Sequence, residues 1–200
     1  MKKYIFILFS LVLSSVQAAQ FEEGVEYKVV QGVASNEPIV VEFFSYVCPH
    51  CYTFEPMLEK LEARLPDMQL KKTPVAFLGG EMGPILQRAY AAAVLLKVED
   101  TMSPVLFDAM IKAKKKPSNM ADIKALFIAN DVSEKKFDSV INSFMLNGMI
   151  SQYDKATERF DVHGTPSVIV KNKYELDMGE VGSEERFYQI VEYLLTKDES

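Results

Sequence analysis

The sequence predicts an α/β protein in which two β-containing ends of the chain are separated by an all-helical insert. Three observations support this prediction. Runs rich in β-branched and aromatic residues occur at 39–44, 69–77 and 166–176, near the two ends of the chain. Residues 79–158 instead carry apolar side chains at helical spacing. Residues 184–195 close the chain with an amphipathic helical pattern.

The first residues have the pattern of a secretory signal peptide, residues 1–18. Lys2 and Lys3 precede an apolar run from Tyr4 to Leu13, and small residues lead to Ala18. The apolar run is about half of the roughly 20 residues that span a bilayer, so it predicts export rather than anchoring. Cleavage after Ala18 would leave 20 basic and 28 acidic side chains, a balance that disfavours nucleic acid and anionic membranes as main partners.

The strand predicted over Ile39–Phe44 follows the turn residues Asn36–Pro38, and its composition is typical of a buried central strand. Apolar residues then keep helical spacing from Pro49 to Leu65. An extended pattern resumes over Gln69–Phe77. The local order is therefore strand, turn, helix, strand.

The insert, residues 79–158, is expected to hold four or five helices. Helical patterns occur at 85–95, 104–111, 123–128 and 137–149, separated by clusters of Gly, Pro, Asn and Asp. We expect these helices to form a subdomain of their own.

Beyond the insert, two strands over Pro166–Val170 and Tyr174–Leu176 precede the helix Glu184–Leu195. We therefore expect residues 19–78 and 159–200 to form one discontinuous domain, with the helical domain inserted between its two parts.

The chain contains only two cysteines, Cys48 and Cys51. An exported protein can form disulfides, but a loop closed over so few residues would stabilise the fold little. A zinc half-site is the alternative, although zinc usually takes four ligands and only His50 and His163 could add nitrogen. The spacing therefore favours a redox-active pair that needs no metal or cofactor.

Cys48-Pro49-His50-Cys51 lies where the predicted helix begins. Pro49 suits the first helical position, which makes Cys48 the N-cap. Unpaired N–H groups and the positive end of the helix dipole would favour the Cys48 thiolate. We expect Cys48 to be the exposed nucleophile and Cys51 the resolving thiol. His50 could add donors or positive charge toward the Cys48 sulfur, or be a tolerated polar residue in an exposed first turn.

Glu42 is a carboxylate within the apolar strand, six residues before Cys48. It could face solvent at a sheet edge or pair with Lys72 on the next strand. If it is buried, it could instead exchange protons with Cys51 and help that thiol to ionise.

Gly164-Thr165-Pro166 follows His163 and opens the next predicted strand. A proline at that position could hold a cis bond. Thr165 could then offer backbone groups to an extended substrate peptide.

These motifs resemble those of the DsbA family. The resemblance rests on Val41–Glu55 together with Gly164–Pro166, and extends over Ala19–Gly24, Phe77–Gly80 and Asn172–Tyr174, so that it covers essentially the whole chain. It implies a thioredoxin fold interrupted by a helical domain, in a monomeric protein of the Gram-negative periplasm.

The resemblance also implies a function. The oxidised protein would pass its Cys48–Cys51 disulfide to newly exported proteins through a mixed disulfide at Cys48, and a DsbB-type membrane partner would reoxidise it with quinone. Glu42 would be the buried carboxylate and Pro166 the cis-proline.

The resemblance further implies that Glu55 and Lys72 form a charged pair near the buried acid. Thr165 departs from the pattern, because many enterobacterial relatives carry valine there, whereas thioredoxin-fold isomerases often carry threonine.

Two other functions remain open at this point. A disulfide isomerase or reductase would use the same Cys-X-X-Cys motif from a reduced pool, although DsbC-type isomerases add an N-terminal dimerisation domain, and only about 20 residues of the mature chain precede the first expected strand. A chaperone-like binder would capture unfolded chains in an apolar groove near Thr165, independently of its cysteines.

Overall fold

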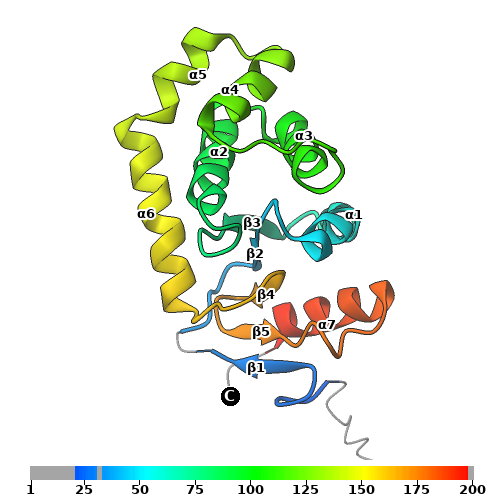
Figure 1. Cartoon of the computed structure of the whole chain (residues 1–200). Helices are drawn as coiled ribbons and strands as arrows, with labels where there is room; N and C mark the ends of the chain where they lie inside the picture. Colours follow the sequence, from blue (N-terminus) through cyan, green and yellow to red (C-terminus); the bar gives the residue numbers. More distant parts are fainter. Residues whose placement is uncertain (1–20, 31–32, 198–200) are drawn as a thin grey trace, which may run out of the picture.

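The computed structural model describes residues 21–30 and 33–197 (Figure 1). The predicted signal peptide, residues 1–18, lies outside these ranges. In the described part of the chain, no helix is both long enough and apolar enough to cross a membrane.

Strands from both parts of the described chain that flank the helical region form one mixed sheet. Its strands are β1 (Tyr27–Val29), β2 (Ile39–Phe44), β3 (Gln69–Pro74), β4 (Ser167–Val170) and β5 (Tyr174–Leu176). They are arranged in the order β1-β5-β4-β2-β3. The internal strand β2 pairs in parallel with β3 and antiparallel with β4, and all six of its residues are buried, as its composition predicts.

The strand β1 is absent from the sequence-based expectation. It has only three residues and pairs antiparallel with β5 at the sheet edge, and two of the three are exposed. So short and exposed a segment carries little hydrophobic pattern of its own. Its pairing depends on β5, which lies far along the chain.

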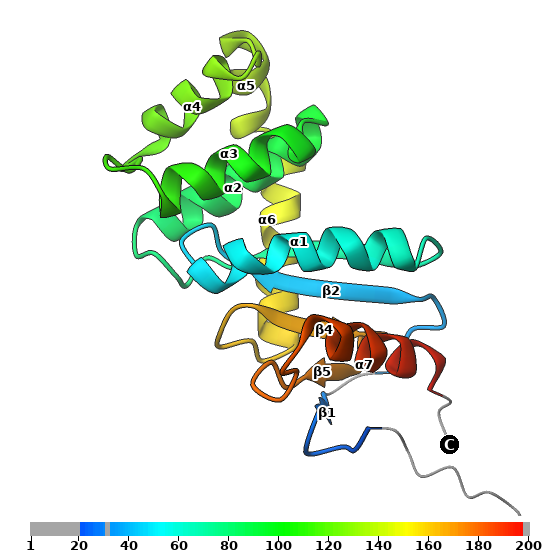
Figure 2. The same cartoon turned by 90° about the vertical axis from the view of Figure 1, so that its right-hand side faces the viewer.

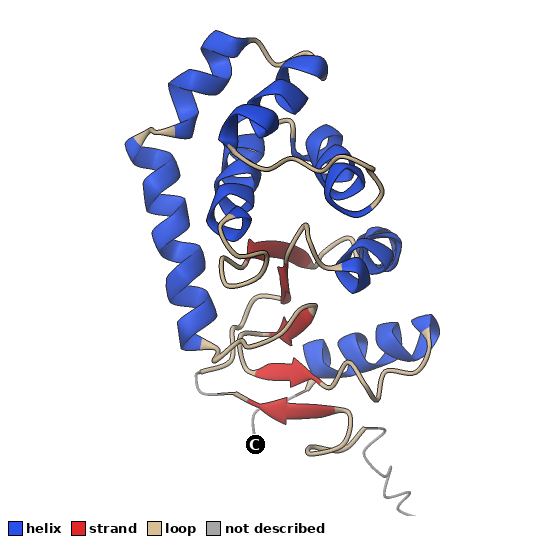
Figure 3. Ribbon diagram, in the orientation of Figure 1, coloured by secondary structure: helices blue, strands red, loops and turns tan. Residues whose placement is uncertain are grey.

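Seven helices complete the described part of the chain (Figure 3): α1 (Pro49–Arg64), α2 (Met82–Leu96), α3 (Glu99–Ile111), α4 (Met120–Ala129), α5 (Glu134–Ile141), α6 (Phe144–Arg159) and α7 (Glu184–Thr196).

Two helix boundaries differ from the expectation. The pattern at 137–149 is two helices, because Ser143 caps α6 by accepting a hydrogen bond from the Leu146 N–H. Helix α3 begins at Glu99 rather than Pro104, and its first turn contains the acidic residues that favour a helix N-terminus.

Helices α1 and α7 pack on the same face of the sheet (Figure 2). Phe54 of α1 and Phe187 of α7 meet edge to face, with ring centroids 5.1 Å apart. On the other face, Phe160 at the end of α6 packs against Phe43 of β2, at 5.9 Å between centroids.

Helices α2 to α6 lie between β3 and β4 in sequence; α2 to α5 lie beyond the β3 edge of the sheet, and α6 runs back from them alongside it (Figures 1 and 2). Their hydrophobic core is continuous with the residues around the motif and includes Phe44, Tyr46, Cys48 and Cys51. The division into a discontinuous domain and an insert at residues 79–158 remains a prediction.

Candidate active site

Helix α1 begins directly after Cys48, which is its N-cap. Cys48 has extended backbone angles, φ −90° and ψ 112°, and Pro49 opens the helix. The Cys51 N–H donates a hydrogen bond to Cys48 Sγ at 3.3 Å. The sulfur therefore accepts one of the donors that the helix would otherwise leave unpaired.

Both cysteines are free thiols in this structure and both are buried. The expectation that Cys48 is exposed is wrong, because its residue is only 8% exposed, against 0% for Cys51. The loop before β4 lies against it, and Cys48 Sγ donates to the Thr165 carbonyl oxygen at 3.4 Å. Cys48 is still the more accessible of the two cysteines.

Electrostatics separate the two thiols. A hydrogen bond from the Cys51 thiol lowers the pKa of Cys48 to about 5, despite the opposing effect of burial, and the Thr165 side chain and the N–H groups of Cys51 and His50 lower it further. The same bond to Cys48, together with burial, raises the pKa of Cys51. One proton shared by the pair therefore resides on Cys51.

The His50 side chain is exposed. The backbone N–H of His50 is among the groups that lower the pKa of Cys48. An electrostatic role for the imidazole remains a prediction.

Glu42 is fully buried on the internal strand β2, which excludes the sheet-edge alternative. Lys72 is its neighbour in register on β3, with Nζ 3.5 Å from a Glu42 carboxylate oxygen. Neither carboxylate oxygen has a hydrogen-bond partner in the described structure. Burial raises the pKa of Glu42 to about 8, and the nearby Lys72 charge only partly offsets this effect.

Lys72 also contacts Glu55 of α1, with Nζ 2.5 Å from a carboxylate oxygen. Burial lowers the pKa of Lys72, but Glu42 and Glu55 outweigh it, so the net pKa is raised and Lys72 stays charged. Glu55 is more exposed than either partner, with 23% of its side chain accessible. The three ionisable groups therefore form a chain from the sheet interior toward the surface.

The loop Gly164-Thr165-Pro166 lies against the cysteines, and the Thr165–Pro166 peptide bond is cis. The Gly164 carbonyl oxygen accepts a hydrogen bond from Ser167 Oγ at 3.0 Å. The Thr165 Oγ1 atom is buried without a hydrogen-bond partner.

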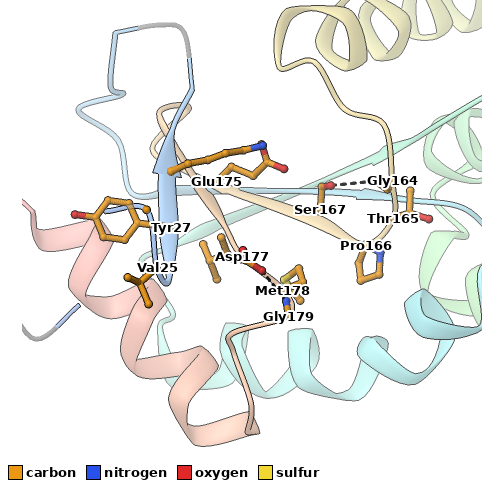
Figure 4. A pocket seen from close by; sticks show the side chains of 13 residues that line it. Val25, Tyr27, Gly164, Thr165, Pro166, Ser167, Glu175, Asp177, Met178 and Gly179 are labelled. Carbon is orange, nitrogen blue, oxygen red and sulfur yellow. Dashed lines mark hydrogen bonds and ion pairs between the residues drawn. The ribbon is translucent and has the colours of Figure 1, made fainter. Parts of the chain in front are cut away.

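This loop borders a cavity of about 630 Å³. Figure 4 shows Thr165 and Pro166 at one end of it, with Met178 and Gly179 beside Pro166 and Val25 and Tyr27 toward the other end. The other lining residues come from β1, β5 and their flanking turns and from the start of β4: Gly24, Lys28, Gly164, Ser167, Glu175, Leu176 and Asp177.

A second hollow, of about 410 Å³, lies between the same loop and helix α1. Its lining from α1 is His50, Thr53, Phe54 and Met57, and it shares four residues with the first cavity: Thr165, Pro166, Met178 and Gly179.

The sequence reasoning missed Met178 and Gly179. The Gly179 N–H donates to an Asp177 carboxylate oxygen at 2.9 Å, a turn that the sequence Asp-Met-Gly after a strand could have indicated. Its position beside Pro166 depends on tertiary packing.

Within residues 21–30 and 33–197, no group of three or more His, Cys, Asp and Glu side chains is placed to hold a metal ion.

A dithiol at a helix N-terminus, facing a cis-proline loop on a mixed sheet, defines the class of protein: a thiol-disulfide oxidoreductase with a thioredoxin fold. The model of the DSBA-like thioredoxin domain matches residues 39–189. The chain therefore belongs to the DsbA family, and its activity is thiol:disulfide interchange.

Relatives and solved structures agree with this assignment. The chain is 36% identical to the thiol:disulfide interchange protein DsbA of Pectobacterium carotovorum over 98% of its own length and all of the relative. It is 39% identical to DsbA of Dickeya dadantii, covering 87% of this chain and 86% of that one.

Among solved structures, Klebsiella pneumoniae DsbA superposes with a TM-score of 0.81 at 29% identity, covering 90% of this chain and all of the other. A Proteus mirabilis DsbA with a cysteine-to-serine change, in complex with a non-covalently bound peptide PWATCDS, superposes with a TM-score of 0.82 at 31% identity, covering 90% of this chain and all of the other.

Proposed function

We propose that the oxidised protein donates its Cys48–Cys51 disulfide to newly exported proteins. A substrate thiolate attacks Cys48 Sγ, the Cys48–Cys51 bond breaks, and Cys51 leaves as a thiolate that takes up a proton. A second substrate thiolate then attacks the substrate sulfur of the mixed disulfide and releases the Cys48 thiolate. The substrate gains a disulfide, and the enzyme keeps both electrons as a dithiol.

The observation that carries this proposal is the position of Cys48 at the N-cap of α1, where its Sγ accepts a hydrogen bond from the Cys51 N–H at 3.3 Å and its pKa is lowered to about 5. A thiol of low pKa leaves quickly, which favours the second step. A stable thiolate also stabilises the reduced protein relative to the oxidised one, and this makes the disulfide an oxidant.

Glu42 is the proposed proton donor and acceptor for Cys51. Its pKa of about 8 lets it hold or release a proton near neutral pH, as a general acid–base group requires. Lys72 and the more exposed Glu55 supply a charged route from Glu42 toward the surface.

Thr165 and Pro166 are the proposed substrate-binding residues, with Gly164 beside them. They border both hollows and lie against Cys48, so a peptide bound there would bring its cysteine to the reactive sulfur. The Proteus mirabilis relative has been solved with the peptide PWATCDS bound, which supports the binding of a peptide as such.

We further propose that the protein is a monomer exported to the periplasm by its signal peptide, residues 1–18. A membrane oxidase of the DsbB type would reoxidise the dithiol and pass the electrons to quinone. The relatives from Gram-negative bacteria that are named DsbA support this setting.

The test is to trap mixed disulfides in cells that express the Cys51→Ala variant. Without the resolving thiol, Cys48 should accumulate covalent adducts with exported cysteine-containing proteins and with the membrane oxidase. The Cys48→Ser, Cys51→Ala variant is the control and should trap neither. If the wild-type protein is fully reduced in cells at steady state, a disulfide isomerase or reductase is the correct function instead.

A further inference from the structure

Helix α3 contacts the chain on both sides of the cysteine pair. Before the pair, the Tyr46 hydroxyl shares a hydrogen bond of 2.8 Å with Ser103 Oγ, and both residues are buried. The Tyr46 ring also meets Phe107 edge to face, at 4.7 Å between centroids. The residue two positions before Cys48 is therefore held by the helical insert.

After the pair, the same helix holds Tyr52. Its ring lies 5.7 Å from Phe107 between centroids, and Lys112 Nζ lies 4.7 Å from its ring centroid. The Asp108 carboxylate lies 3.0 Å from the same Lys112 Nζ. One ring, that of Phe107, thus contacts tyrosines on both sides of the motif.

The contacts of α3 before and after the cysteine pair differ in strength. Asp108 and Lys112 lie at the surface, where such pairs contribute little. The Tyr46–Ser103 bond is buried, and a buried hydroxyl that loses its partner is costly. Ser103 therefore supplies the buried polar contact between α3 and the turn before Cys48.

We propose that Ser103 is a positioning residue for the dithiol reaction. By fixing Tyr46 it holds the turn Ser45–Val47, in which the Cys48 N–H donates to the Ser45 carbonyl oxygen at 3.0 Å. That turn fixes Cys48 Sγ against the N–H groups of helix α1. This inference rests on the proposed function, because it concerns how strongly Cys48 acts as a leaving group.

The physical link is the directionality of hydrogen bonds. The Cys51 N–H to Cys48 Sγ bond is already long, at 3.3 Å, and such bonds weaken steeply as they lose alignment. A small displacement of Cys48 relative to the start of α1 therefore reduces the stabilisation of the Cys48 thiolate more than it disturbs the packing around Cys48.

The test compares Ser103→Ala, Tyr46→Phe and the double variant with Ser151→Ala, whose serine is exposed on α6. We expect each of the first three variants to raise the pKa of Cys48 from about 5 toward about 6, measured by thiolate absorbance. In glutathione buffers the equilibrium should shift about three- to tenfold toward the disulfide form, since one pKa unit corresponds to about tenfold. Ser151→Ala should change neither quantity.

Urea unfolding separates positioning from stability. Ser103→Ala strands the buried Tyr46 hydroxyl, whereas the double variant leaves no unpaired partner and should recover much of the lost stability. If the Tyr46–Ser103 bond positions Cys48, the pKa of Cys48 should stay raised in the double variant. The rise should be no larger than in either single variant. If stability falls while the pKa of Cys48 is unchanged, Ser103 has only a structural role and the inference is wrong.

Should Ser103→Ala fail to fold, Tyr46→Phe removes the same bond by losing a single oxygen atom and gives the same test. The two proposals also fail separately. An ordinary pKa for Cys48 in the wild-type protein contradicts the proposed function, whereas a low wild-type value that these variants leave unchanged contradicts only the positioning role.

Discussion

Glu42 and Lys72 are neighbours in register on β2 and β3, with Nζ of Lys72 3.5 Å from the Glu42 carboxylate, yet the pKa of Glu42 is raised to about 8. Burial outweighs the adjacent positive charge, and Glu55 competes for Lys72 at the shorter distance of 2.5 Å. Glu42 is therefore mostly protonated at pH 7, within reach of a charged partner.

Replacement of Glu42 by Gln should stabilise the protein at pH 7.5. The folded pKa of Glu42 is raised, so the folded state holds a proton that the unfolded state releases, and stability is lost as pH rises from 4.5 through about 8. Glu42→Gln removes that loss, and we expect a gain of about 1–3 kcal/mol by urea unfolding at pH 7.5. Near pH 4 the two proteins should unfold at similar urea concentrations.

The same substitution should slow disulfide donation. Without an ionisable group at position 42, protonation of the departing Cys51 depends on water, and we expect oxidation of a model peptide to slow about tenfold or more at pH 7. Stopped-flow measurement of the single turnover checks this. Glu55→Gln is the control, because Glu55 is partly exposed and acts through Lys72, and its effect should be smaller. Equal rates for Glu42→Gln and wild type would rule out the proton-transfer role.

The reduced protein should be more stable than the oxidised protein, by a margin that depends on pH. The pKa of Cys48 is lowered from 9.0 to about 5, so its thiolate stabilises the folded dithiol fully above pH 9. That contribution declines as pH falls and is lost below pH 5. Urea midpoints of the two redox forms, measured between pH 4 and pH 8, should converge at the acidic end. A constant difference across this range would contradict the assignment of the low pKa.

Thr165→Val should raise the pKa of Cys48. The Thr165 hydroxyl is buried without a hydrogen-bond partner, and its side chain is among the groups that lower the pKa of Cys48, as a donor to the thiolate would. Valine has a similar shape but no donor, so we expect a rise of about half a unit, with stability unchanged or improved by about 1 kcal/mol. Thiolate absorbance and urea unfolding measure the two effects. Thr165→Ser keeps the donor and should leave the pKa of Cys48 low.

Met178→Asp should weaken binding of substrate peptides without changing the thiol chemistry. Met178 borders both hollows beside Pro166, and loss of one buried apolar contact of this size weakens binding by about tenfold or more. We expect a higher KM for peptide oxidation and an unchanged pKa of Cys48. Met145→Asp, at an exposed position on α6, is the matched control and should leave KM unaltered.

Where the structure follows local pattern, the sequence was sufficient to predict it. The strand Ile39–Phe44 is uniformly apolar apart from Glu42, and Pro49 marks the start of a helix, so β2, α1 and the N-cap position of Cys48 could be placed without coordinates. The family resemblance added the cis bond before Pro166, which a Thr-Pro pair alone does not establish.

Where the structure depends on residues far apart in the chain, the sequence was insufficient. Cys48 was expected to be exposed, but the carbonyl group that lies against it belongs to Thr165. The Tyr46–Ser103 bond joins residues 57 positions apart, and no local pattern signals it. The split between α5 and α6 was missed for a different reason, since apolar spacing continues across the Ser143 cap.

The two cysteines pack into the same hydrophobic cluster as the helices between β3 and β4. A shortened protein that kept the sheet, α1 and α7 but replaced residues 79–158 with a simple linker would therefore leave Phe44 and Tyr46 uncovered and remove one wall around the sulfur atoms. Grafting the four-residue motif onto a smaller scaffold would transfer the sulfur atoms without that wall. For an engineer, the smallest transferable unit is the motif together with helix α3, which contacts Tyr46 and Tyr52 on its two sides.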